Sequence, residues 1–269
     1  MTVDEALALA RQLGIDRGDA QTLLSHLTGQ SRTWLITHGD TPVPAADAAL
    51  RRLAHGEPLA HLTGWQPFHG LRLQVTPATL IPRPDTETLV DWALELLAAL
   101  PGEPAVVDLG TGSGAIALAI KAACPRARIT AVDFSADALA VARANGERLA
   151  LDVDWRHGSW FEPLAGQRFN LVVSNPPYIA GDDPHLPALR HEPLTALTPG
   201  GDGLADLQTL IDVAPQHLTP GGWLLMEHGW DQAEAVASRL RNSGFSQATL
   251  RHDLAGRARA SGGRWNATT

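Results

Sequence analysis

Hydrophobic positions along the chain follow two spacings, and the change between them divides the sequence into two regions. In the first region, residues 1–63, apolar side chains recur every three or four positions, as in Val3, Leu7 and Ala10. Thr2 and Glu5 open this run with a capping-box pattern. The spacing predicts a small bundle of four short helices, over residues 3–13, 16–28, 32–37 and 44–55.

Residues 64–84 change to a spacing of two. Leu71, Leu73 and Val75 are apolar, whereas the residues between them, Arg72 and Gln74, are polar. This alternation is typical of a half-buried strand, and the surrounding glycines and prolines are typical of turns. The pattern predicts a β-hairpin that links the two regions.

From residue 85 to residue 269, short apolar runs alternate with stretches of helical spacing. Strands are expected over 105–109, 128–133, 153–157, 170–174 and 223–227, and 245–250 and 257–265 are candidates for closing strands. Helices are expected over 85–100, 115–123 and 136–150. The alternation predicts an α/β domain with a mostly parallel sheet that is covered by helices on both faces.

Composition agrees with a folded protein and limits its partners. Of the 269 residues, 44% are hydrophobic, which is enough for a sizeable core. The net charge is -8, and residues 1–75 carry six basic against seven acidic side chains. Because an acidic protein is repelled by a phosphate backbone, direct nucleic-acid binding is not expected.

Signals for export, membrane insertion and metal binding are weak in this sequence. Asp4 and Glu5 stand where a signal peptide is basic, and no apolar run is long enough to span a bilayer. The single cysteine, Cys124, excludes an internal disulfide and is expected to pack at a helix end. The eleven histidines lack metal-ligand spacing, so no metal is expected. We therefore expect a cytoplasmic, monomeric protein without membrane contact.

A glycine-rich loop joins an expected strand to an expected helix and predicts a cofactor site. After Asp108 and Leu109, the loop residues are Gly110, Thr111, Gly112, Ser113 and Gly114. Glycines allow a tight turn and a close approach of the backbone to a ligand, and unpaired N–H groups at the helix start attract it. The G-x-G-x-G spacing differs from the G-x-G-x-x-G of dinucleotide-binding loops, which favours S-adenosylmethionine.

Two further positions fit a nucleotide-like cofactor. Asp133 ends the next expected strand, where a carboxylate can accept hydrogen bonds from both hydroxyls of a ribose in either cofactor class. Trp160 and Phe161 follow the third strand. An aromatic side chain there either covers an adenine or packs in the core, and position alone does not decide between the two.

The second candidate site is Asn175-Pro176-Pro177-Tyr178, which follows an expected strand at the sheet edge where ligands bind. The prolines hold a rigid loop whose carbonyls act as acceptors beside the Asn175 side chain. A planar amide or amine has N–H donors for these acceptors, and Tyr178 can lie against it near a cationic sulfur. Acceptors on the N–H bonds orient a poorly nucleophilic nitrogen and stabilise its growing positive charge. The loop predicts methylation of a planar nitrogen, of an amide or of a nucleobase.

Other motifs accompany these two sites: Gly56–Pro58, Leu62–Gly64, Thr76–Glu87, Gly200–Leu204, Pro220–Gly222, Glu227–Gly229 and Asp253–Gly256. Together they make the chain closely resemble, over nearly its whole length, the PrmC/HemK family of protein-(glutamine) methyltransferases that modify class-1 peptide release factors. The resemblance implies a Rossmann-like class I methyltransferase domain with a seven-stranded sheet over residues 85–269. It also implies a hairpin linker over 64–84 and a helical domain over 1–63 that docks the release factor.

The resemblance further implies methyl transfer from S-adenosylmethionine to the glutamine side-chain amide in the release factor's Gly-Gly-Gln motif. Cofactor-binding residues would be Gly110, Thr111, Gly112, Ser113, Gly114, Asp133, Trp160 and Asn175. Asn175, Pro176 and Tyr178 would be catalytic, and with Pro177 they would form the glutamine pocket. The segments 191–193 and 257–259 depart from the family pattern, and neither is expected to touch this chemistry.

Three other functions are compatible with parts of the sequence. A nucleic-acid methyltransferase acting on an exocyclic amine uses a similar tetrad but would need a basic cleft, which the charge disfavours. A non-enzymatic interaction module would not need the Asn175–Tyr178 loop. A dinucleotide-dependent oxidoreductase is disfavoured by the spacing of the glycines.

Overall fold

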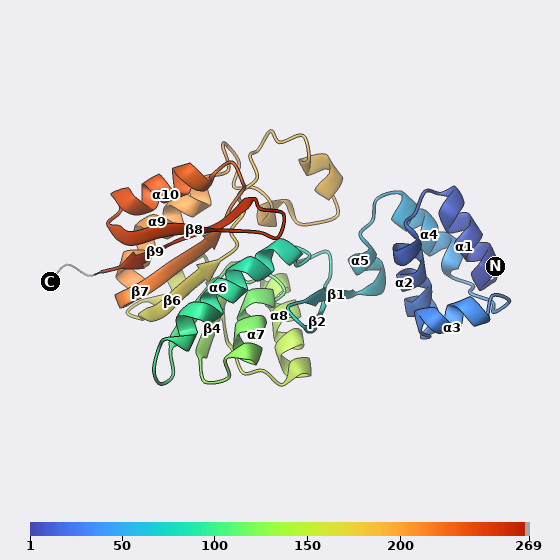
Figure 1. Cartoon of the computed structure of the whole chain (residues 1–269), viewed down its shortest axis with the longest axis horizontal. Helices are drawn as coiled ribbons and strands as arrows, with labels where there is room; N and C mark the ends of the chain where they lie inside the picture. Colours follow the sequence, from blue (N-terminus) through green and yellow to red (C-terminus); the bar gives the residue numbers. More distant parts are fainter. Residues whose placement is uncertain (267–269) are drawn as a thin grey trace. The chain divides into compact units, whose positions relative to one another are not determined.

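The structure is a computed structural model that describes residues 1–266 of the chain (Figure 1). The chain divides into two compact units, the first from Met1 to Trp65 and the second from Gln66 onward. This boundary lies close to the expected end of the helical region, and most of the hairpin groups with the second unit. No helix among the described residues is long and apolar enough to cross a membrane.

The first unit is helical. Its elements are α1 (Val3–Gln12), α2 (Arg17–Thr28), α3 (Arg32–Thr37), α4 (Ala46–Ala54) and α5 (Leu59–Thr63). The capping box at α1 is confirmed, because the Glu5 side chain accepts from the Thr2 N–H at 2.8 Å and the Thr2 hydroxyl from the Glu5 N–H at 3.4 Å. The core is aliphatic, with Leu23, Leu24 and Leu50 fully buried.

The expectation of four helices in this unit is wrong by one. The additional helix, α5, is a single turn between Pro58 and Gly64 and is too short to display an apolar period. The fourth helix also begins at Ala46 and not at Pro44, since Val43–Ala46 forms a turn closed by the Ala46 N–H and the Val43 carbonyl.

The second unit contains a two-stranded hairpin and a seven-stranded sheet. The hairpin strands are β1 (Trp65–Phe68) and β2 (Leu71–Gln74). The large sheet has the order β5-β4-β3-β6-β7-β9-β8. Strand β9 runs opposite to the other six strands, which are parallel to one another. Its strands are β3 (Ala105–Leu109), β4 (Arg128–Asp133), β5 (Asp154–His157), β6 (Phe169–Ser174), β7 (Leu218–Glu227), β8 (Phe245–His252) and β9 (Ala258–Trp265). The predicted mostly parallel sheet, including both closing strands, is confirmed.

Helices cover both faces of the sheet, as Figure 1 shows. They are α6 (Glu87–Ala98), α7 (Ala115–Ala123), α8 (Ala136–Leu149), α9 (Ala205–His217) and α10 (Ala233–Asn242). Alternation along β3 assigns the faces, because Val106 packs with α6 and α7 whereas Val107 and Leu109 pack with α9 and α10. The two buried layers fix the strands against slippage, since a shift by one residue would exchange them.

The starts of α6 and β7 differ from expectation. The segment Pro84–Thr86 is a 3-10 turn, so the α-helix α6 begins at Glu87. Strand β7 begins at Leu218 and not at Trp223, because Leu218 already pairs with Phe169 of β6 across a register shift. The glycines and proline of this stretch suggest a turn, yet they lie in the irregular part of the pairing.

The register of the sheet brings four candidate residues to one edge. One row runs across β4, β3, β6 and β7 through Val132, Leu109, Ser174 and Met226. The next residue along each of these strands is Asp133, Gly110, Asn175 and Glu227. Because β3 continues the chain toward β4 on one side and pairs with β6 on the other, this edge is the topological switch point where α/β sheets bind ligands.

A buried asparagine ties the hairpin to the glycine loop within the second unit. The Asn145 side chain accepts from the Gln74 N–H at 2.7 Å and donates to the Gln74 carbonyl at 2.9 Å. It also donates to the Ser113 carbonyl at 3.0 Å. Since Asn145 is fully buried, these bonds satisfy polar groups that water cannot reach, and they fix the back of the loop.

Candidate active site

The glycine loop leaves the end of β3 in a sharp turn. The N–H groups of Gly110 and Thr111 donate to the Val132 carbonyl at 2.9 and 3.0 Å, which holds the loop against β4. Gly110 has a φ of 72°, and a Cβ there would lie 3.2 Å from the Trp160 ring. A side chain at this position would therefore displace the indole.

A fully buried carboxylate holds the loop from behind. Asp108 accepts from the Thr111 hydroxyl at 2.6 Å and from the Ala117 N–H in the first turn of α7 at 3.2 Å, both through Oδ2. Its Oδ1 is buried without a hydrogen-bond partner among the described residues. Burial raises the pKa of Asp108 to about 7, against the lowering effect of these two hydrogen bonds.

Asp133 at the end of β4 is the acid that was expected to bind a ribose. One oxygen accepts from the Gly112 N–H at 2.8 Å and the other from the Ser135 N–H at 2.9 Å. Burial raises the pKa of Asp133, and the hydrogen bonds from Ser135 and Gly112 hold part of that shift back. Both oxygens retain acceptor capacity toward the cavity that Asp133 lines.

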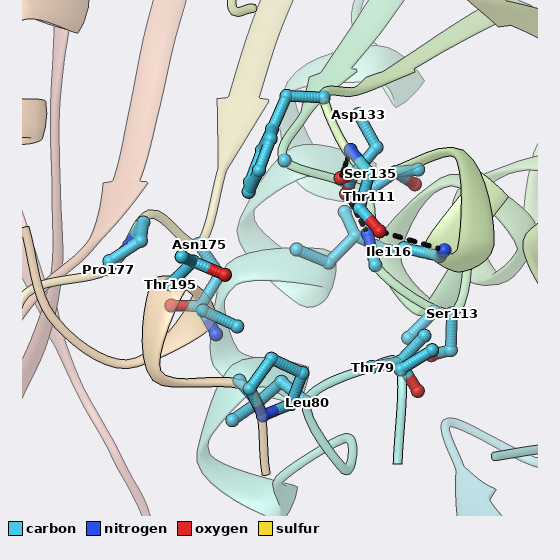
Figure 2. A pocket seen from close by; sticks show the side chains of 18 of the residues that line it. Thr79, Leu80, Thr111, Ser113, Ile116, Asp133, Ser135, Asn175, Pro177 and Thr195 are labelled. Carbon is cyan, nitrogen blue, oxygen red and sulfur yellow. Dashed lines mark hydrogen bonds between the residues drawn. The ribbon is translucent and has the colours of Figure 1, made fainter. Parts of the chain in front are cut away.

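A cavity of about 320 Å³ lies over this edge of the sheet. Figure 2 shows Asp133, Ser135 and Thr111 on one side and Asn175, Pro177 and Thr195 on the other, with Leu80 at the bottom of the view. Of the expected cofactor residues, this cavity is lined by Gly110, Thr111, Gly112, Ser113, Asp133, Trp160 and Asn175. Gly114 lies behind the wall, at the N-cap of α7, where a Cβ would crowd Leu118, Trp155 and Ala142.

The two aromatic candidates after the third strand separate in the structure. Trp160 lines the cavity with a φ of 46°, a left-handed conformation that non-glycine residues rarely adopt. Burial raises the pKa of Asp206, another lining residue, and a hydrogen bond from the Trp160 side chain opposes this. Phe161 is instead a core residue that stacks on His217, with ring centroids 4.6 Å apart. Trp160 therefore lines the cavity, whereas Phe161 belongs to the core.

A smaller cavity of about 120 Å³ adjoins the first. The residues that line both are Leu80, Arg83, Asn175 and Ala196. Within the tetrad, Pro177 lines only the larger cavity, whereas Pro176 and Tyr178 line only the smaller. Asn175 therefore stands where the two cavities meet, and it is the one tetrad residue that belongs to both.

Tyr178 is anchored at both its side chain and its backbone. Its hydroxyl donates to Glu227 Oε1 at 3.0 Å, and its carbonyl accepts from the Gln232 side chain at 2.9 Å. Gly203 packs directly on this carbonyl, since a Cβ there would lie 2.2 Å from the oxygen. Burial raises the pKa of Tyr178, the Glu227 carboxylate adds to this, and Arg259 opposes it.

Both segments that depart from the family pattern contact the site, which corrects the expectation that they lie apart from it. Buried Glu192 accepts from the Ile81 N–H at 2.8 Å and pairs with Arg83, a residue that lines both cavities. Arg259 faces Tyr178 and pairs with Asp85 and Asp253, each at 3.1 Å. The links of Glu192 to Arg83 and of Arg259 to Tyr178 and Asp85 have no sequence signal, because these partners are 109, 81 (259 − 178) and 174 (259 − 85) positions apart.

The structure adds lining residues that sequence reasoning did not single out. Phe134, at 55% exposure, follows Asp133 and lines the larger cavity, as does Thr195. Thr86 also lines it, within the segment Pro82–Glu87 that the family resemblance implies to border the site. Glu227 lines the smaller cavity and is 1% exposed. In the sequence, Glu227 was marked only as part of the motif Glu227–Gly229. Its register beside Asn175 in the sheet is what brings it to the site.

The remaining polar candidates have structural contacts. His228 Nδ1 donates to the Gly229 carbonyl, 2.8 Å away, its Nε2 lies 2.7 Å from Ser261 Oγ, and burial lowers the pKa of this histidine. Cys124 is half-buried at the C-cap of α7. The described part of the chain contains no group of three or more histidine, cysteine or acidic residues arranged to hold a metal ion.

Two family models match the chain. Residues 4–64 match the model of the PrmC N-terminal domain, and residues 87–202 match the model of the methyltransferase small domain. The two matches correspond to the helical unit and to the part of the sheet that carries the glycine loop and the tetrad.

Similar proteins cover almost the whole length. A release factor glutamine methyltransferase of Bordetella pertussis is 50% identical over 258 residues, which cover 93% of this chain and 95% of the relative. The corresponding protein of Escherichia coli strain K12 is 44% identical over 270 residues, 97% of this chain and 96% of the relative. A crystal structure of a methyltransferase from Pyrococcus furiosus shares the fold, with a TM-score of 0.55 and 19% identity over 82% of this chain and 99% of that one.

Asp108 makes stability depend on pH. Between about pH 4 and 7 its carboxyl stays protonated in the folded chain but ionises in the unfolded chain, which favours unfolding as the pH rises. We expect the difference in free energy of unfolding between the parent and Asp108→Asn (parent minus variant) to fall by up to about 4 kcal/mol across this range. Urea unfolding followed by circular dichroism at several pH values measures it.

Asp152→Asn, at an exposed position, is the matched control for this measurement and should show no such trend. A parent-minus-variant difference that stays constant from pH 4 to pH 8 would show that Asp108 does not titrate in this range.

Proposed function

The chain belongs to the release factor glutamine methyltransferase family, and from this premise we propose what it methylates and with which donor. It is an enzyme, a protein-(glutamine) methyltransferase. We propose that it transfers a methyl group from S-adenosylmethionine to the side-chain amide nitrogen of the glutamine in the Gly-Gly-Gln motif of class-1 peptide chain release factors. The observation that carries this proposal is the meeting of two cavities at Asn175.

The larger cavity has the chemistry that S-adenosylmethionine requires. Its volume of about 320 Å³ falls in the range of small-molecule sites. Asp133 offers two oxygens to ribose hydroxyls, and the N-terminus of α7 behind Gly112 and Ser113 supplies N–H groups. Phe134 and Trp160 provide apolar faces for an adenine. When bound, S-adenosylmethionine supplies a methyl group on a positively charged sulfur.

The smaller cavity fits a side chain that ends in a planar amide. At about 120 Å³ it is too small for a nucleotide-like cofactor, and apolar residues such as Leu80, Ile179 and Leu197 form much of its lining. The polar lining residues are Arg83, Asn175, Tyr178 and Glu227. An aliphatic stem would contact the apolar lining while its amide reaches Asn175, at the junction with the larger cavity.

The chemistry of these residues follows from the weakness of an amide nitrogen as a nucleophile. Its lone pair is delocalised, and the nitrogen therefore has to be oriented for attack. The Asn175 oxygen and the Pro176 carbonyl would accept hydrogen bonds from its N–H groups and hold the lone pair toward the larger cavity. Held in this way, the nitrogen would give its lone pair to the methyl carbon, and the electron pair of the breaking carbon–sulfur bond would remain on sulfur. The same acceptors stabilise the positive charge that grows on nitrogen, and a proton leaves to water afterwards.

The helical unit is proposed to dock the release factor. It matches the PrmC N-terminal domain, and its nearly balanced charge of six bases and seven acids over residues 1–75 favours a protein over a polyanion. We place the enzyme in the cytoplasm because its proposed substrate works in translation termination. We also propose that it acts as a monomer. A nucleobase amine is the other acceptor that the tetrad accommodates, and the assay below tests it.

Methyl transfer should require the proposed glutamine. Incubating the enzyme with S-adenosylmethionine labelled in the methyl group should label a purified class-1 release factor, and changing the glutamine of its Gly-Gly-Gln motif to alanine should abolish the label. Peptide mass spectrometry locates the methyl group. Equal labelling of both factors, or labelling of DNA or RNA alone in parallel reactions, contradicts the proposal.

Asn175→Ala should separate cofactor binding from turnover. Loss of one preorganised polar contact in the transition state typically costs about 100- to 1000-fold in kcat, and we expect a loss of this size. Affinity for S-adenosylhomocysteine, measured by calorimetry, should change only a few-fold, since Asn175 is one of many lining residues. Asn242→Ala, at the exposed end of α10, is the control. Turnover within a few-fold of the parent would exclude Asn175 as the acceptor.

A further inference from the structure

The orientation of the Asn175 side chain matters because its two ends have opposite roles. Only the carbonyl oxygen, Oδ1, accepts a hydrogen bond from a substrate N–H, whereas the nitrogen, Nδ2, would repel it. We propose that Thr86 is a positioning residue, which fixes Nδ2 away from the substrate through a hydrogen-bond chain that ends on Glu227. This inference rests on the proposed function for the identity of the substrate, but not for the chain of bonds itself.

Thr86 stands at a helix start without capping the helix. It is the N-cap residue of α6, a position where a threonine hydroxyl usually accepts a backbone N–H. Its hydroxyl makes no such bond and instead accepts from Asn175 Nδ2 at 3.3 Å. At 4% exposure, Thr86 has little access to water. The hydroxyl is therefore committed to the site and not to the helix.

Glu227 provides the acceptor at the other end of the chain. It is 1% exposed, and its Oε1 accepts from the Tyr178 hydroxyl. Its Oε2 is buried and has no hydrogen-bond partner among the described residues. Burial raises the pKa of Glu227, and Thr86 is the first of the groups that oppose this rise. The Thr86 hydroxyl, which accepts from Asn175 and has a proton to give, is the donor that the proposal assigns to Oε2.

The single proton of the Thr86 hydroxyl then determines the orientation of the Asn175 side-chain amide. A hydroxyl has one proton, and a carboxylate can only accept. If the Thr86 proton points to Glu227, the oxygen of Thr86 can only accept from Asn175, so Asn175 must present Nδ2 and leaves Oδ1 free. With the amide reversed, the Thr86 proton would go to Asn175, and Oε2 would remain buried and unsatisfied, which is unfavourable.

The same carboxylate therefore holds both ends of the tetrad. Tyr178 donates to Glu227 directly, and Asn175 donates to Thr86, the residue that we assign as the donor to Glu227. Register explains the proximity, because Glu227 follows Met226, which pairs with the Ser174 that precedes Asn175. Arg259 is the nearby cation that favours the charged, accepting form of Glu227.

Exchange of threonine for valine removes the hydroxyl at nearly constant volume. We expect Thr86→Val to lower kcat by about 10- to 100-fold, as misplacement of a reacting group does, with affinity for S-adenosylhomocysteine within threefold of the parent. Thr86→Ser keeps the hydroxyl and should restore kcat to within about threefold. Thr209→Val, which removes an exposed hydroxyl from α9, is the matched control and should have no effect.

A double-mutant cycle shows whether Thr86 acts through Asn175. In the Asn175→Ala background, Thr86→Val should cause no further loss of kcat, because there is no amide left to orient. An undiminished loss in that background, or Thr86→Val turning over like the parent, would overturn the proposal.

A measurement on the resting enzyme separates this inference from the proposed substrate. In protein labelled with 15N-asparagine, the side-chain NH2 signals that disappear in Asn175→Ala belong to Asn175. Their hydrogen exchange should be slowed in the parent and in Thr86→Ser, and faster in Thr86→Val and in Glu227→Gln. Equal exchange in the parent and all three variants refutes the chain of bonds, whereas failure of release factor methylation alone refutes only the substrate.

Discussion

The register of four neighbouring strands is the constraint on which the site depends. Pairing across β4, β3, β6 and β7 places one residue of each strand in a single row, and the following residues are Asp133, Gly110, Asn175 and Glu227. Burial of both faces of the sheet makes a slip by one residue costly, because it would turn every core side chain to the opposite layer. The larger cavity and the Asn175–Tyr178 loop are therefore positioned by the same core that stabilises the fold.

Three buried carboxylates at this edge have different tasks, set by their surroundings. Asp108 faces inward and holds the glycine loop and the start of α7. Asp133 holds the same loop from the cavity side and keeps acceptor capacity for a ligand. Glu227 faces the smaller cavity and the tetrad. Each is desolvated, and each is compensated by N–H or O–H donors from residues that shape the site.

Much of the fold was predictable, and the limits have physical reasons. Apolar period and turn residues predicted the helical region and the parallel sheet, and the glycine spacing predicted which strand end would carry the loop. The one-turn helix α5 and the irregular start of β7 were not predictable, since neither shows a period. For the site, motifs identified Asp133, Trp160 and Asn175 as cavity residues. The contacts of Thr86 and Arg259 were not predictable, because they join segments far apart in the sequence and depend on strand order.

We propose that Asn175, between the two cavities, binds the nitrogen that receives the methyl group. A crystal structure of the enzyme with S-adenosylhomocysteine and a peptide containing Gly-Gly-Gln tests this most directly. We expect the glutamine amide in the smaller cavity, with its nitrogen about 3 Å from the Asn175 side chain and facing the sulfur. A glutamine bound elsewhere, with the smaller cavity empty or filled by another side chain of the peptide, would contradict it.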